Sequence, residues 1–203
     1  MTRLAQRLTV ALVLLFTCAL PVGGAQASVS RENVATAIAQ DQDGSRAFDF
    51  EWDVSKQSGG VVDHLNAAHA TAQNCTGCRA TAIAFQIVIV SGGATTYRPH
   101  NEAIAQNIAC QSCEAFARAA QFVRVVEAPV KFTDAGRAEL ADVRADLSAL
   151  ERQDLPPFQL AEAVELQKSR VSSVLNHELV LKSDPRTEAD VNARRLYQAA
   201  DTG

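Results

Sequence analysis

The sequence contains few of the large side chains that usually fill a protein core. Aromatic residues make up 5% of the 203 residues and include a single tryptophan. The sequence also has a single methionine. Apolar residues nevertheless reach 47%, and many of them are alanines. The length suits one compact domain, or one domain with an appendage. Such a composition indicates a thin, closely packed core between elements that approach one another closely.

The sequence also lacks the patterns that most often identify an enzyme or a nucleic-acid-binding protein. The net charge is -4, and no basic stripe is present, so nucleic acid is not an expected partner. No glycine-rich phosphate loop and no nucleophile-elbow serine occurs. His177 and Glu178 begin an H-E-x-x-H zinc-protease motif, but Leu181 replaces its second histidine. We therefore expect a non-enzyme without catalytic residues, bound cofactor or metal.

The first residues contain an apolar run that is too short for a membrane-spanning helix. Leu8–Leu20 has fewer than the roughly 20 residues that spanning requires. Arg3 and Arg7 precede this run, and an A-x-A sequence at 25–27 follows it. This is the pattern of a secretory signal peptide. We expect cleavage after residues 1–27, a secreted or extracytoplasmic protein, and no stable membrane insertion afterwards. A retained anchor and a lipoprotein are weaker alternatives.

The sequence contains an internal repeat. When Asn66–Val90 is shifted by 35 positions onto Asn101–Val125, eleven of the 25 positions are identical. Apart from the cysteines, the matches within each half fall on every second residue, which is the side-chain period of a β-strand. A weaker copy begins 33 residues upstream, at Asn33. The repeated face consists mostly of alanine, with asparagine and glutamine at matching heights.

These observations predict a mainly β fold with C-terminal α-structure. Residues 28–130 are expected to form three stacked strand-turn-strand repeats, as a hairpin stack or a short β-solenoid. The aligned amides are expected to form ladders. The first copy differs, because Asp49, Glu51 and Asp53 interrupt its alanine face; we expect them to protect an edge strand, with cation binding as an alternative. A helical alternative exists, but the β-branched run Ile87–Val90 favours strands.

After Pro129 the pattern becomes helical. Residues 131–182 are expected to form an antiparallel helical hairpin, with Thr133 as the N-cap of the first helix and Pro157 near the start of the second. Apolar residues recur at helical spacing. They are Leu140, Val143, Leu147, Leu150, Leu160, Val164, Val171, Val174 or Leu175, and Leu179. Residues 183–203 have little apolar periodicity and are expected to form a flexible tail.

Two C-x-x-C pairs, one in each of the second and third repeats, are the strongest chemical signal. The sequence has five cysteines, and removal of residues 1–27, which contain Cys18, leaves four: Cys75, Cys78, Cys110 and Cys113. An even number in an exported chain favours disulfides, either within each turn or across repeats. A structural zinc site is the second interpretation, with His64, His69 and His100 nearby in sequence but more typical of solvated residues. A redox-active C-x-x-C is the third, although it normally uses a helix N-terminus.

The doubled C-x-x-C within alternating alanines resembles a known family. The segments DGSRAFDFEWDV, VVDHLNAAHATAQNCTGCRATAIAFQIVIV, PHNEAIAQNIACQSCEAFARAAQFV and VKFTDAGRAELADVRADLSAL are similar to the extracytoplasmic region of actinobacterial proteins named peptide zinc metalloproteases. The resemblance covers about 33–180. It implies an exported, uncharacterised domain, because the protease label belongs to a membrane domain that is not part of this similarity. The alternating alanines are also similar to curlin-type amyloid repeats.

We therefore expect an exported, non-catalytic repeat protein stabilised by disulfides, with an interaction or structural role at the cell surface. Its partner is expected to be a protein or a second copy of the chain. One alternative is a zinc-binding or redox accessory to a membrane peptide-processing or export system. The other is the subunit of a self-assembling surface fibre.

Overall fold

The computed structural model describes residues 28–93 and 96–182, and each of the three repeats forms one strand, one turn and a second strand. Each of these six strands has 13 residues, and successive side chains point to opposite faces of the sheet. The strands are β1 (Ser28–Gln40), β2 (Arg46–Ser58), β3 (Val61–Gln73), β4 (Arg79–Ser91), β5 (Thr96–Ile108) and β6 (Glu114–Val126).

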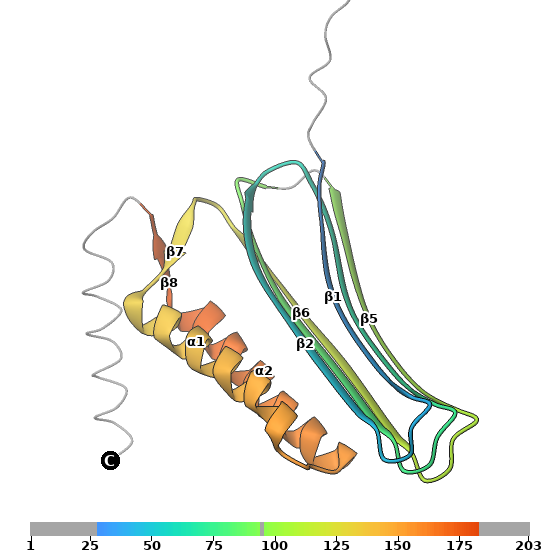
Figure 1. Cartoon of the computed structure of the whole chain (residues 1–203). Coiled ribbons are helices and arrows are strands. Elements are labelled where there is room, and N and C mark those ends of the chain that lie inside the picture. The colour runs from blue at the N-terminus through green and yellow to red at the C-terminus, as the bar shows by residue number, and fades with distance from the viewer. Residues whose placement is uncertain (1–27, 94–95, 183–203) are drawn as a thin grey trace, which may run out of the picture.

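The two strands of a repeat lie in different sheets. One parallel sheet has the order β1-β3-β5 and the other has the order β2-β4-β6 (Figure 1). Asn33 lies beside Asn66, and Asn66 beside Asn101, so the strand register is the one given by the repeat alignment. The mainly β fold with three stacked repeats is thus confirmed. Of the two arrangements left open, the structure has that of a short solenoid.

The repeated alanine face forms the core between the two sheets. Small side chains allow the sheets to approach closely, and every alanine of this face in β1, β3 and β4 is at most 2% exposed. These residues are Ala35, Ala37, Ala39, Ala68, Ala70, Ala72, Ala80, Ala82 and Ala84. The predicted amide ladders are present: Asn33 Nδ2 donates to Asn66 Oδ1, and Asn66 Nδ2 donates to Asn101 Oδ1, both at 2.7 Å. In the other sheet, Gln121 Nε2 donates to Gln86 Oε1 at 2.7 Å.

Two helices cover the outer face of the β2-β4-β6 sheet (Figure 1). Helix α1 (Asp134–Ala149) begins after the predicted N-cap Thr133, and a short 3-10 turn η1 (Leu150–Arg152) follows it. Helix α2 (Pro157–His177) begins at the predicted proline. The periodic apolar residues of both helices pack on the outer side chains of β4, all at most 2% exposed: Ile83, Phe85, Ile87 and Ile89. These side chains form a second core, whose residues are larger than the alanines between the two sheets.

Three details differ from the sequence-based expectations. Helix α2 ends at His177, and Leu179 belongs to the short strand β8 (Leu179–Leu181), which pairs antiparallel with β7 (Val130–Phe132). On the outer face of β6, Arg118 and Arg124 predict exposure to solvent, but Phe116 and Phe122 are half-buried because the helices cover them. The burial of β6 was missed because helical periodicity shows that a helix has an apolar face, but does not show which strand that face contacts.

Two predictions lie outside the described residues, namely the signal peptide at 1–27 and the tail at 183–203. Within the described part of the chain, neither helix combines the length and the apolar character that crossing a bilayer demands.

Candidate functional site

The three turns that join the strands of each repeat stack on one another at one edge of the solenoid. Matching positions of the turns adopt the left-handed backbone region. At the start of the first and second turns, φ is 60° at Asp41 and 54° at Asn74. Near the end of the same turns, φ is 73° at Gly44 and 68° at Gly77. Glycine and asparagine tolerate this region well. In the third turn Ser112 takes the glycine position with φ of 53°. The turn backbone is therefore repeated as well as the strands.

Backbone hydrogen bonds hold neighbouring turns in register. Gly44 N–H donates to Thr76 O, and Gly77 N–H donates to Gln111 O, both at 2.8 Å. Thr76 N–H also donates to Asp43 Oδ1 at 2.6 Å. None of these contacts involves sulfur, and the first turn has Gln42 in place of a cysteine. The stacking of the turns therefore does not depend on cysteine chemistry.

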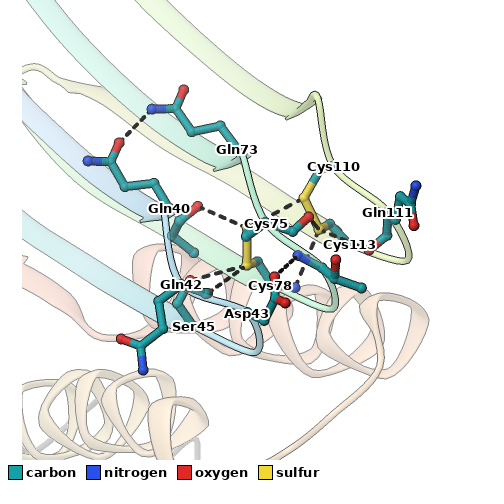
Figure 2. Close-up of a disulfide and its surroundings, with 12 residues drawn as sticks. Gln40, Gln42, Asp43, Ser45, Gln73, Cys75, Cys78, Cys110, Gln111 and Cys113 are labelled. Atoms are coloured by element: carbon teal, nitrogen blue, oxygen red, sulfur yellow. Dashed lines mark hydrogen bonds between the residues drawn. A yellow bond between two sulfur atoms is a disulfide. The ribbon is translucent and has the colours of Figure 1, made fainter.

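The four cysteines occupy the second and third turns and form one cluster (Figure 2). Cys75 is bonded to Cys78, and Cys110 to Cys113, so the disulfides lie within each turn. The two disulfides are in contact, since Cys75 Sγ lies 3.6 Å from Cys110 Sγ. All four Sγ atoms lie within 4.8 Å of one another. Stacking of the turns thus brings together sulfur atoms that are 35 residues apart in sequence.

The two disulfides differ in their exposure to solvent. Cys75 is 8% exposed and Cys78 is 1% exposed, because the first turn covers them. Ser45 in that turn contacts Cys78, with 3.2 Å between Oγ and Sγ. Cys110 and Cys113 are half-buried, because no fourth turn stacks on them among residues 28–93 and 96–182. An external reagent therefore reaches the Cys110–Cys113 disulfide first.

The first-repeat end of the stack is covered by acidic side chains. Asp49 Oδ2 accepts a hydrogen bond of 2.5 Å from Thr36 N–H, which lies on the free edge of β1. Asp53 forms an ion pair with Arg31, with 3.4 Å between Oδ1 and Nη1. These acids replace Ala82 and Gln86 of the second repeat. The structure thus supports the expectation that they protect the edge strand.

The third-repeat end has no such cover. Ala103 and Ala105 of β5 are exposed, although their counterparts in β1 and β3 are buried. Val123 and Val125 of β6 are 36% and 52% exposed, while their register partners Val88 and Val90 in β4 are fully buried. This open end face therefore presents core-type side chains and two strand edges to solvent.

The histidines and the partial protease motif have structural roles. His64 is 1% exposed and lies 2.8 Å from Gln57 Oε1 through Nε2, so the expectation of a solvated residue was wrong. Its position on the inner face of β3 explains the burial. His69 and His100 pair with Glu102. Among the described residues, the potential metal-ligating group consists of the four cysteines alone. Glu178 accepts a hydrogen bond from Thr133 Oγ1.

Comparison of the chain with protein-family models, with curated proteins and with solved structures gives no match. The candidate sites are therefore identified from the geometry of this chain. Sequence reasoning identified the cysteines but missed Ser45 and the end residues Asn101 and Gln121 as functional candidates. The repeat alignment contained the necessary signal, because it places Ser45 on Cys78 and places Asn101 and Gln121 in the last copy.

Proposed function

We propose that the chain is an exported, non-catalytic repeat protein that acts at the cell surface as a structural or interaction module, through the open end face of its third repeat. The observation that carries this proposal is the difference between the two ends of the stack. Acidic side chains cover the first, while the second exposes Ala103, Ala105, Val123 and Val125. A surface of unpaired strand edges with exposed core residues is typical of a protein interface.

The occupant we propose for this face is a second copy of the chain. Head-to-tail stacking would bring the open face against the acidic cover of the first repeat, which opposes growth of a fibre. Pairing of two open faces about a two-fold axis closes after two copies. The 13-residue strands are about 43 Å long, and the sheets with their side chains span about 15 Å, so the face offers on the order of 600 Å² per copy. Two copies reach about 1,200 Å², which suffices for a specific interface.

The ends of the two amide ladders make this face self-complementary. Asn101 Nδ2 donates one hydrogen to Ala119 O at 3.2 Å. Each asparagine of the ladder donates its other amide hydrogen toward the next repeat, so that of Asn101 is directed out of the open end face. Gln121 donates back to Gln86, so its Oε1 is directed outward. One face therefore presents both a donor and an acceptor. A second copy supplies the complementary pair.

Export is supported by the signal-peptide pattern and by disulfides, which are typical of oxidising compartments. The resemblance to actinobacterial extracytoplasmic regions agrees with this proposal. Non-reducing peptide mass mapping of the protein secreted by an expressing cell would test export. A mature N-terminus near residue 28 is expected, together with one peptide that contains the Cys75–Cys78 disulfide and another that contains the Cys110–Cys113 disulfide. A protein that remains intracellular would contradict the proposal.

The association can be tested by moving the natural acidic cover from one end to the other. Asp49, Glu51 and Asp53 correspond to Ala117, Ala119 and Gln121 of the third repeat. The variant with Ala117→Asp, Ala119→Glu and Gln121→Asp should be monomeric at concentrations where the wild-type protein sediments as a dimer. A matched control places three acids on exposed positions of α1, as Ala141→Glu, Ala145→Glu and Ser148→Asp, and should still dimerise. A monomeric wild-type protein, or a dimer that survives the acidic cover, would contradict self-association through this face.

A further inference from the structure

The sulfurs of the four cysteines lie close together across two stacked turns. We infer that Cys75, Cys78, Cys110 and Cys113, once both disulfides are reduced, bind one divalent ion of the zinc class with tetrahedral sulfur coordination. This inference is independent of the end-face association proposed above, because it concerns the turns. Disulfides and metal then belong to two redox states of one cluster.

The distances within the cluster suit four-sulfur coordination. A zinc–sulfur bond of about 2.3 Å places the sulfurs of a tetrahedral site about 3.8 Å apart. Here all four Sγ atoms lie within 4.8 Å of one another, and the contact between the two turns, from Cys75 to Cys110, is 3.6 Å. Opening the two disulfides requires only that the sulfurs within each turn separate. The Cys75–Cys110 distance between the turns is already close to the tetrahedral value.

The turns keep these positions without the sulfur–sulfur bonds. Gly77 N–H donates to Gln111 O at 2.8 Å, and Glu114 N–H donates to Cys78 O at 2.9 Å, so backbone hydrogen bonds align the two cysteine turns. The first turn has the same fold with Gln42 and Ser45 at the cysteine positions. Reduction therefore leaves four thiols close together, and little chain entropy is lost when a metal binds.

Neighbouring donors favour thiolate sulfur. Cys78 N–H points at Cys113 Sγ at 3.3 Å, and Ser45 Oγ lies 3.2 Å from Cys78 Sγ, so a backbone amide and a hydroxyl donate to two of the ligands. Hydrogen bonds of this kind orient metal ligands and stabilise their charge. Cys75 and Cys78 shield one side of the site, while the half-buried Cys110 and Cys113 leave an entry path.

The chemistry balances with an external dithiol as reductant. Two dithiol molecules transfer four electrons and four protons to the two disulfides, which yields four protein thiols and two oxidised reductant molecules. One divalent ion then replaces the four thiol protons, which are released to water. In the reverse direction, two molecules of the oxidised dithiol accept four electrons from the four thiolates and four protons from water, which restores both protein disulfides and releases the ion.

Cobalt(II) provides a direct test, because sulfur coordination produces a charge-transfer absorption and tetrahedral geometry produces visible bands. The mature chain, residues 28–203, is reduced with a phosphine, freed of excess reductant without oxygen, and titrated with cobalt(II) and then zinc(II). We expect one cobalt per chain, displacement by one zinc, and one zinc per chain in native mass spectrometry. The oxidised protein should bind neither ion. A reduced chain that keeps its strand circular dichroism but gives no charge-transfer band would overturn the inference.

Two variants copy the natural cysteine-free turn. Cys110→Gln with Cys113→Ser, and Cys75→Gln with Cys78→Ser, reproduce the residues of the first turn. Each should remove the tetrahedral bands and weaken zinc binding by more than about 100-fold. His69→Ala, which lies outside the cluster, should leave binding unchanged. Bands that persist in both cysteine variants, or a wild-type chain that unfolds on reduction, would also overturn the inference.

Discussion

At the residue scale, polar side chains within the alanine core have defined partners, and His64 is the informative exception. Its Nε2 lies 2.8 Å from Gln57 Oε1, but its Nδ1 is buried without a hydrogen-bond partner among the described residues. Burial lowers the pKa of His64, Arg31 lowers it further, and Asp53 and Asp63 act in the opposite direction. The folded protein therefore holds a neutral imidazole in a place that disfavours the imidazolium.

This environment predicts a loss of stability on mild acidification. In the unfolded chain the histidine pKa is about 6.5, so below that pH the unfolded state binds more protons than the folded state. The contribution of His64 is fully present above the unfolded pKa and is lost as the pH falls toward the lowered folded pKa. Urea unfolding of the wild-type protein and of His64→Gln at pH 7.5 and 5.5 measures the effect. The variant should lose less stability on acidification than the wild type.

The exposed His100 provides the matched control, because its side chain is 66% exposed. The variant His100→Gln should change the pH dependence less than His64→Gln does, because exposed contacts such as that between His100 and Glu102 contribute little to stability. Equal acid sensitivity of the wild-type and His64→Gln proteins would show instead that carboxylates alone account for the pH effect.

At the scale of elements, the start of α1 is locked to the end of α2. Thr133 Oγ1 accepts from Gly136 N–H at 3.0 Å, and Thr133 N–H donates to Glu178 O at 2.9 Å. A Cβ atom added at Gly136 would lie 2.6 Å from Glu178 Cβ. The glycine is therefore required by the close approach of two helix ends, and by no special backbone angle.

Gly136→Ala should consequently destabilise the protein, although alanine normally stabilises a helix by about 1 kcal/mol relative to glycine. The expected loss is about 1 to 3 kcal/mol, because overpacking forces the helix ends apart. Urea unfolding would measure it. The control Ala138→Gly, at an exposed position of the same helix, should cost about 1 kcal/mol through propensity alone. Stabilisation by Gly136→Ala would contradict the close contact.

The elements also show how far the sequence could predict the structure. Identities at every second residue of the repeat predicted the strands and their register. Identical residues lie side by side when repeats stack, as Asn33, Asn66 and Asn101 do. Local caps gave the helix starts at Thr133 and Pro157. The pairing of β7 with β8 was not predictable, because these three-residue segments carry no periodic signal. The sequence predicted disulfides but left open whether they form within a turn or across repeats, because stacked turns bring all four cysteines together.

At the scale of the whole molecule, one sheet supports two different cores. The inner face of β4 presents alanines to the β1-β3-β5 sheet, while its outer face presents residues such as Phe85 to the helices. Phe85 also lies between Trp52 and Phe122, with ring centroids 5.9 and 6.2 Å away. Because β4 is buried on both faces, neither core can open without exposing part of this strand. The two cores should therefore unfold together.

Leu147→Ala tests this coupling. Leu147 of α1 is 0% exposed in the helix-covered core, and its truncation should cost about 2 to 5 kcal/mol. If the molecule is one cooperative unit, native-state hydrogen exchange should show that loss in β3 as well, at amides such as those of Ala68 and Ala70 in the opposite sheet. The neighbouring exposed change Ser148→Ala should leave exchange in β3 unchanged. Faster exchange confined to α1 and α2 would mean instead that the solenoid is stable without its helices, with the outer face of β4 then available to solvent.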